Sequence, residues 1–197
     1  MNKRKALKQN IENIKRRLQN KHSVHDYTFF DSQERIKFKE ILSDKLSGQK
    51  LFDCCKNLGI FIVSFGEELK YVLHIECFYR IRIGERLILT YNDEFYAPNG
   101  EMLTRKEIKK SQRKFYKNSL LEHSFEEFKF LTKGAVVSSI EINEVGDLYV
   151  SFDNGVIIEA FLDCMGQNNE FYRFFEYKND SPHYIVKCLA GKIILQN

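Results

Sequence analysis

The sequence predicts an α+β protein, mainly antiparallel β-structure built from two similar hairpin units, with an N-terminal helical extension and a helical insertion between the units. The spacing of apolar residues is helical near the N-terminus, changes to a period of two from residue 51, and returns to helical between residues 101 and 133. A frame of Val-Ser-Phe, a loop, and Ile-Glu-x-Phe also occurs twice, at residues 63–78 and 150–161. This repeat indicates a duplicated β-hairpin.

The N-terminal extension, residues 1–47, is predicted to hold two helices. In the first, Leu7, Ile11, Ile14 and Leu18 recur at steps of four, three and four, which places them on one stripe of the helix. An isolated helix of about 20 residues is marginal in water. We therefore expect the stripe to dock on the body of the protein, on a second copy to give a homodimer, or on a partner.

The second helix of the extension has signals at both ends. Asp31 followed by Glu34 predicts a capping box at its start, and Gly48 predicts its end. Residues 48–197 are then expected to form a single α+β domain, which is long enough to bury a core. Within it, residues 71–83 alternate in polarity and are predicted to form one strand.

The last third of the chain is predicted to be a β-meander, and its Asp-Asn-Gly turn at residues 153–155 decides the register. A two-residue turn would bury the carboxylate of Glu159, unpaired, among core side chains, which costs several kcal/mol. A three-residue loop closed by Gly155 in the left-handed region instead places Glu159 beside Tyr149 and Ser151 on the outer face. We predict the three-residue loop.

The helical insertion near residues 101–133 is basic in its first half. Ser124 and Glu127 predict a capping box at the start of a helix that ends near Gly134. The segment before it, residues 103–117, is interpreted either as a helix or as a basic arm.

Charge is separated along the chain although the net charge is only +4. Residues 1–21 hold eight basic residues and one acid, and residues 101–118 hold seven and two. Removing these from the totals of 31 basic and 27 acidic residues leaves sixteen and 24, so the remaining body has a net charge of −8. Such a layout favours nucleic acid at the basic segments, or a basic protein at the acidic body.

The predicted compartment and the predicted lack of cofactors rest on sequence features that are absent. We expect a cytoplasmic protein with no membrane partner, because no secretory leader and no run of membrane-spanning length is present. Five cysteines without a C-x-x-C pair indicate reduced, mostly buried thiols. His22, His25 and Asp26 lack further ligands of known geometry, so we expect no metal and no cofactor.

The repeated frame places polar residues at matching positions, namely Ser64, Glu76, Ser151 and Glu159. If the two hairpins packed about a pseudo-twofold axis, Glu76 and Glu159 would approach each other as paired carboxylates suited to acid and base chemistry. The simpler interpretation is that both are outward-facing strand residues, offset by nearby arginines. No nucleophile, metal cluster or phosphate loop accompanies them, so we expect no enzymatic activity and nearly unchanged folding after Glu76→Gln or Glu159→Gln.

The order of the pieces in residues 48–195 resembles a family of small uncharacterised bacterial proteins encoded beside secreted or contact-dependent toxins. The resemblance is carried by "LSGQKLFDCC", "IVSFG", "LHIECFYRIRIGERLIL", "NDEFYAP", "IEINEVGDLYVSFDNGVIIEAFLD" and "FYRFFEYKNDSPHYIVKC". This chain departs from the family in having Phe78-Tyr79 and Tyr172 where a tryptophan would precede the arginine. The resemblance implies a toxin-neutralising or other interaction role and supplies no catalytic residues.

The leading functional hypothesis is therefore a non-catalytic protein-binding module, an immunity protein that neutralises a partner toxin by masking its surface. Acidic residues of the net −8 body would match a basic groove of the partner. The candidate contacts are acidic and aromatic residues near loops that we expect to be exposed: Glu67, Glu68, Asp93, Glu94, Tyr96, Asp163 and Glu170.

The alternative hypothesis is a nucleic-acid-associated protein that uses the basic segments 1–21 and 101–118. Phe115 and Tyr116 would be available to stack on bases. The candidate phosphate contacts are Arg4, Lys8, Arg16, Arg17, Lys109, Lys110 and Arg113.

Overall fold

The computed structural model describes residues 27–114, 116–163, 169–177, 181–189 and 192–196. The first predicted helix, with its apolar stripe at residues 7–18, lies outside these ranges. Its docking site and the homodimer through it therefore stay predictions.

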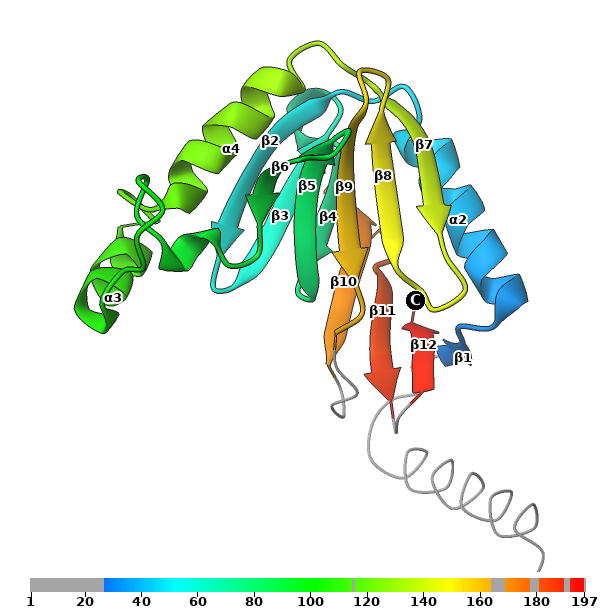
Figure 1. Cartoon of the computed structure of the whole chain (residues 1–197). Coiled ribbons are helices and arrows are strands. Elements are labelled where there is room, and N and C mark those ends of the chain that lie inside the picture. The colour runs from blue at the N-terminus through cyan, green and yellow to red at the C-terminus, as the bar shows by residue number, and fades with distance from the viewer. Residues whose placement is uncertain (1–26, 115, 164–168, 178–180, 190–191, 197) are drawn as a thin grey trace, which may run out of the picture.

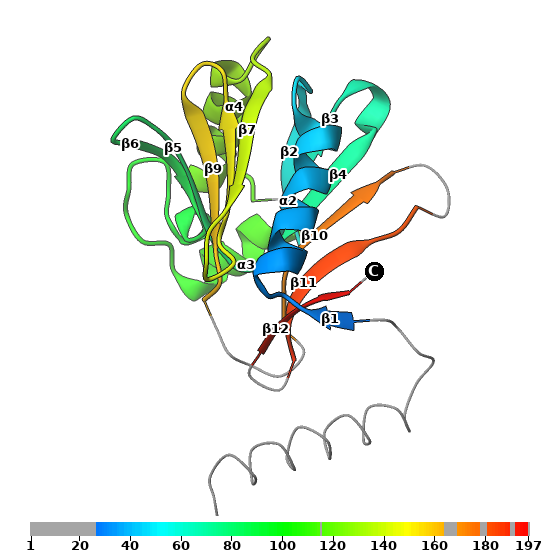
Figure 2. The ribbon, with the colours of Figure 1, turned by 90° about the vertical axis from the view of Figure 1, so that its right-hand side faces the viewer.

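Two antiparallel sheets face each other and enclose one apolar core, as Figures 1 and 2 show. The seven-stranded sheet has the order β1 (Tyr27–Phe29), β12 (Lys192–Gln196), β11 (Tyr184–Leu189), β10 (Glu170–Glu176), β4 (Tyr71–Ile75), β3 (Ile60–Phe65) and β2 (Leu51–Asn57). The five-stranded sheet has the order β6 (Arg86–Thr90), β5 (Phe78–Ile83), β9 (Val156–Phe161), β8 (Leu148–Phe152) and β7 (Val137–Ile142). The predicted α+β fold with mainly antiparallel strands is confirmed.

The segment predicted as one strand, residues 71–83, is two strands in different sheets. Glu76 and Cys77 separate β4 from β5, and their amide groups both donate to the carbonyl oxygen of Phe171, at 2.8 and 3.2 Å. The prediction of a continuous strand was wrong because buried and exposed side chains keep alternating where the chain passes from one sheet to the other. Every second side chain still faces the shared core, so the period of two does not reveal the change of sheet.

Helix α2 (Ser32–Leu46) has the two ends that the sequence predicted. The side chain of Asp31 accepts hydrogen bonds from the amides of Gln33 and Glu34, at 2.9 and 3.1 Å. After the last turn, Gly48 adopts a φ of +76°, a left-handed conformation that favours glycine.

The packing of α2 does not follow the predicted boundary after residue 47. Phe38, Leu42 and Leu46 are fully buried in the common core, and α2 lies between the two sheets along one open side (Figure 2). The ring of Phe38 lies 6.3 Å from that of Tyr172 in β10. Together with β1, which pairs with β12, this part of the extension belongs to the domain.

Helix α4 (Leu120–Leu131) covers the opposite side of the core, against β6 and β2. Its buried ring of Phe125 stacks on Phe61 of β3 at 5.7 Å, and Phe128 meets Phe152 of β8 at 6.3 Å. The predicted start at Ser124 was wrong, since the helix begins four residues earlier. No helix among the described residues is long and apolar enough to cross a membrane.

The predicted register of the Asp-Asn-Gly loop is confirmed. Val150 pairs with Ile158 and Tyr149 with Glu159, and Gly155 adopts a φ of +86°. The core face of this hairpin is buried, and Glu159 lies on the other face as expected.

The repeated frame forms two hairpins, β3–β4 and β8–β9, but their registers differ. Val63 pairs with Leu73, whereas Val150 pairs with Ile158. The sequence frame had matched Ile75 with Ile158, so the second strands are offset by two residues. The hairpins also lie in different sheets, and Glu76 is therefore not the structural counterpart of Glu159.

Two phenylalanines of α4 allow a direct test of the core. Phe128→Ala is expected to lower the free energy of unfolding by about 3–5 kcal/mol, because a fully buried ring is replaced by a cavity. Phe130→Ala, at a side chain 77% exposed on the same helix, is expected to change it by less than about 0.5 kcal/mol. Urea unfolding measures both, and equal losses would contradict the assigned face.

Candidate functional site

A short basic helix, α3 (Arg105–Arg113), stands at one end of the molecule, apart from the sheets (Figure 1). Thr104 begins it with a capping box: the Glu107 amide donates to Thr104 Oγ1, and the Glu107 carboxylate accepts from the Thr104 amide at 2.8 Å. The hydroxyl of Thr104 also donates to the Glu107 carboxylate at 2.6 Å, and this hydrogen bond, followed by that from the Thr104 amide, lowers the pKa of Glu107. The Thr-x-x-Glu pattern at Thr104 and Glu107 is the sequence signal that favours a helix over a basic arm for this segment.

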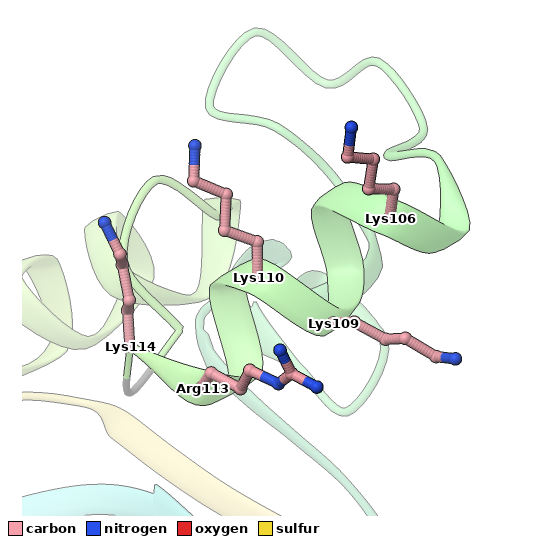
Figure 3. Close-up of a pocket in the computed structure, with 5 residues that line it drawn as sticks. All are labelled: Lys106, Lys109, Lys110, Arg113 and Lys114. Carbon is pink, nitrogen blue, oxygen red and sulfur yellow. The ribbon is translucent and has the colours of Figure 1, made fainter.

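Five cationic side chains extend from α3 and its last turn in two rows (Figure 3). Lys106, Lys110 and Lys114 form one row, and Lys109 and Arg113 form the other. All five line a surface hollow of about 460 Å³. Three of the predicted phosphate contacts, Lys109, Lys110 and Arg113, therefore belong to one surface, which we call the α3 cation face.

The cations of the α3 cation face form no ion pair among the described residues, although Glu107 lies on the same helix and interacts electrostatically with Lys110. Among the residues that the structure describes, the ion pairs involve cations of α2, β2, β5, β6, α4 and β10, and none involves a cation of α3. The positive charge of the helix is thus left for solvent or for a ligand.

A buried ion pair lies beneath α3. The side chain of Lys56 in β2 is fully buried. Its ammonium group donates to Glu94 Oε1 at 2.8 Å and to the carbonyl oxygen of Tyr91 at 3.1 Å. Burial lowers the pKa of Lys56, and the carboxylate of Glu94 acts in the opposite direction. The aromatic rings around the ammonium, with distances from Nζ to the centroid, are Tyr91 at 4.3 Å, Tyr79 at 5.6 Å and Tyr116 at 6.0 Å.

The same carboxylate attaches α3 to the body. Glu94 lies in the short helix η2 (Asp93–Phe95), and its second oxygen accepts from Gln112 Nε2 at 3.3 Å. The neighbouring Asp93 accepts from the Thr90 amide at 2.9 Å and from Ser124 Oγ of α4 at 3.1 Å. We call Lys56, Asp93, Glu94 and Gln112 the polar hub, because it joins β2, η2, α3 and α4.

Several predicted partner contacts are engaged inside the molecule. Asp93 and Glu94 are buried, so their assignment as exposed contacts was wrong. Tyr96 is half-buried, and Asp163 is exposed but accepts from the Phe78 amide at 3.0 Å. Glu170 is half-buried and binds Arg173 through both oxygens, at 2.8 and 2.6 Å.

Two predicted contacts, Glu67 and Glu68, are exposed on the short helix η1 (Glu67–Leu69) between β3 and β4. With Lys70 and Glu176 they line a hollow of about 390 Å³. We call this the acidic corner. Glu176 also forms an ion pair with Lys45 at 3.2 Å.

The polar residues of the repeat do not form a paired-carboxylate site. Ser64 is buried and donates to the carbonyl oxygen of Asp53 at 2.9 Å, and Ser151 is half-buried. Glu159 is only 2% exposed, and it binds Arg80 and Arg82 through different oxygens, the second at 2.9 Å. It is a buried ion-paired residue and not a solvated one, because both arginines lie on the neighbouring strand β5.

Glu76 instead belongs to a mixed cluster on the outer face of the seven-stranded sheet. Burial, and then the charge of Glu170, raise its pKa, while Arg173 opposes them. The ring of His183 stacks on Phe175 at 4.4 Å, and that of His74 meets Phe175 edge-on at 5.1 Å. Burial, followed by the nearby Arg173, lowers the pKa of both histidines. No sequence pattern signals this cluster, because β10 comes to lie between β4 and β11 only in the folded chain.

The remaining predictions concern cysteines, metals and base stacking. Cys54, Cys55 and Cys188 are free thiols, and Cys54, Cys77 and Cys188 are buried. No group of three or more candidate metal ligands occurs among the described residues, and His22, His25 and Asp26 lie outside them. Tyr116 is buried and so is not available to stack on bases, while Phe115 lies outside the described residues. So do Arg4, Lys8, Arg16 and Arg17.

Comparisons with known proteins return no relative. No family model matches the chain, and neither a curated protein nor a solved structure matches it. The family resemblance of residues 48–195 therefore remains an expectation, and function has to be argued from the geometry.

The Lys56–Glu94 pair is expected to stabilise the fold only as a pair. Glu94→Gln leaves the buried ammonium without its carboxylate, and we expect unfolding to become easier by about 3–5 kcal/mol. Lys56→Met should cost a comparable amount, whereas the double variant should lose less than the sum of the two. Urea unfolding measures this cycle, and strictly additive losses would contradict coupling between the two groups.

Glu159→Gln is now expected to destabilise the protein, contrary to the expectation from sequence. We expect a loss of about 1–3 kcal/mol, below that of a deeply buried pair, because the side chains of Arg80 and Arg82 are 41% and 32% exposed and solvent screens them. Glu141→Gln removes a surface pair with Lys39 and should cost less than about 1 kcal/mol. Thermal or urea unfolding measures both variants, and equal losses of stability would contradict the assignment of Glu159 as a buried, ion-paired residue.

Proposed function

We propose that the protein is a non-catalytic binding module that contacts nucleic-acid phosphates through the α3 cation face. The observation that carries this proposal is the set of five exposed cations on one short helix, none paired with an acid among the described residues. Elsewhere in the described chain, cations of six elements have acidic partners within 4.0 Å. The contrast favours a ligand outside the chain for α3.

The internal energetics of α3 support the same proposal. Like charges at steps of three and four destabilise a helix by about 0.2–0.5 kcal/mol per pair, and the α3 cation face contains several such pairs. The capping box and the polar hub hold the helix despite this repulsion. A polyanion would relieve the repulsion and release its own counterions, which is the main driving force of phosphate binding.

The composition of the α3 cation face fits phosphate better than a protein surface. The centres of protein interfaces are depleted of lysine and enriched in aromatic residues, methionine and arginine. Four of the five cations here are lysines, which bind phosphate as point charges. The basic segment 1–21 would add further contacts, and we place the protein in the cytoplasm, where nucleic acid is accessible.

A toxin-neutralising protein-binding role is the second candidate, and the acidic corner favours it. Glu67 and Glu68 are exposed beside a hollow that could receive a basic side chain of a partner. This role keeps the immunity-like expectation of the family resemblance. It ranks second because Asp93, Glu94 and Glu170 are held by internal hydrogen bonds.

The proposal is tested with the full chain and a triple variant, Lys106→Gln, Lys109→Gln and Lys110→Gln. Glutamine keeps the helix propensity and removes three charges. We expect binding to labelled nucleic acid to weaken by at least about tenfold, and the slope of log K against log salt to fall by about 2.7, since each duplex phosphate contact contributes about 0.9. Fluorescence anisotropy between about 50 and 200 mM salt measures both quantities.

The matched control removes the same charge at other exposed lysines: Lys37→Gln, Lys50→Gln and Lys133→Gln. Equal weakening in both triple variants would point to net charge and overturn the α3 assignment. If the full chain binds no nucleic acid at low salt, and Glu67→Lys/Glu68→Lys abolishes capture of one stoichiometric protein, the second candidate replaces the first.

A further inference from the structure

We infer that the α3 cation face recognises the regular sugar-phosphate backbone of a duplex, without reading its sequence. This inference rests on the proposed function, because it names the class of nucleic acid that the same surface would bind. It is carried by the arrangement of the cations, by the side chains that are withheld from bases, and by the way α3 is fixed to the body.

The spacing of the cations suits a repeating array of phosphates. From Lys106 to Lys114 the helix rises by eight residues, or about 12 Å at 1.5 Å per residue. Within a row the cations follow one another at a step of four, about 6 Å along the axis. A duplex presents charges at short, regular intervals along each strand, so a rigid row of this length can meet several phosphates at once.

Side chains placed to read base edges are few on the α3 cation face. Gln112, whose amide could bind adenine, instead donates to Glu94 at 3.3 Å in the polar hub. Ser111 is buried. Only Arg113 among the five cations has the planar fork that recognises guanine. The surface therefore offers contacts to phosphate and few contacts to bases.

Three aromatic rings near α3 are engaged in the interior of the protein. Proteins that bind single strands combine a basic groove with exposed aromatic side chains on which successive bases stack. Tyr116 and Tyr79 are buried around the ammonium of Lys56, and Tyr91 lies over the same ammonium at 4.3 Å. These three rings serve the interior of the protein, so they add no stacking contribution to single-strand binding.

The attachment of α3 keeps the two rows in a fixed orientation. The capping box fixes the first turn, and the Gln112 contact with Glu94 fixes the last turn against η2. A preorganised row of charges loses little entropy on binding a regular partner. A flexible single strand would have to be ordered to match it.

The experiment compares ligands of equal length and mixed sequence: a DNA duplex, the RNA duplex of the same sequence, each separate strand, and a second duplex of unrelated sequence. With five phosphate contacts, the expected salt slopes are about −4.5 for a DNA duplex and −3.5 for a single strand. At about 0.1 M salt this difference corresponds to about tenfold tighter duplex binding. The two unrelated duplexes should bind within about twofold of each other.

The outcomes separate the inference from the proposed function. Binding to both forms that is lost in the Lys106→Gln/Lys109→Gln/Lys110→Gln variant, but is equal or tighter for the single strand, would overturn the duplex inference and keep the α3 site. Binding to neither form would overturn both. A difference of more than about tenfold between the unrelated duplexes would show base readout and contradict the inference.

Two further arms make the comparison sharper. DNA and RNA duplexes share the phosphate chemistry, so the ratio of their affinities identifies which duplex geometry the rows fit. Phe115→Ala tests the aromatic residue that lies outside the described ranges. If Phe115→Ala weakens single-strand binding and leaves duplex binding unchanged, the ring contributes to single strands only and the duplex inference stands. If Phe115→Ala abolishes the preference for duplex over single strand, the inference from the cation rows fails.

Discussion

Two antiparallel sheets share one apolar interior, and the need to cover that interior determines where the other elements lie. The two sheets are joined by short connections such as Glu76–Cys77 and are not hydrogen-bonded to each other along their edges. The interior between them is therefore open on two sides unless other elements cover it. Helix α2 covers one opening with Phe38, Leu42 and Leu46, and α4 covers the other with Phe125 and Phe128. These side chains have large apolar areas, and their removal from water is a main source of the stability of the fold.

The position of α3 follows from this arrangement. Ser124 of α4 binds Asp93, and the adjacent Glu94 binds both the buried ammonium of Lys56 and the amide of Gln112. A charge as deeply buried as Lys56 requires a carboxylate and aromatic faces around it. Glu94, which pairs with the buried lysine, thus also holds α3 in position through Gln112. The cations that α3 presents to solvent are positioned in the same way.

Charges in this protein fall into two groups that the net charge conceals. Most described arginines and lysines of the sheets, α2 and α4 contact carboxylates, and Glu159 is enclosed by Arg80 and Arg82. Those of α3 have no such partners among the described residues. A paired surface has a weak external field, whereas an unpaired row attracts counterions and anionic ligands. The contrast in pairing, more than the count of basic residues, identifies the candidate site.

The sequence by itself determined the local features of this protein. The period of two identified the strands, Asp31 and Gly48 marked the ends of α2, and the cost of burying an unpaired carboxylate chose the correct loop at Gly155. It also located the charge that distinguishes α3. These results depend on neighbours along the chain, where spacing and backbone geometry are sufficient.

Only the tertiary structure decided which residues meet across the chain. The alternating segment at residues 71–83 changes sheets without changing its period, and the repeated frame adopts two registers. Lys56 gives no sign in the sequence of a buried partner 38 residues away, and Glu94 looked like a surface acid. Side-chain pairing at such separations is set by how the sheets and helices pack, and a one-dimensional pattern does not contain that information.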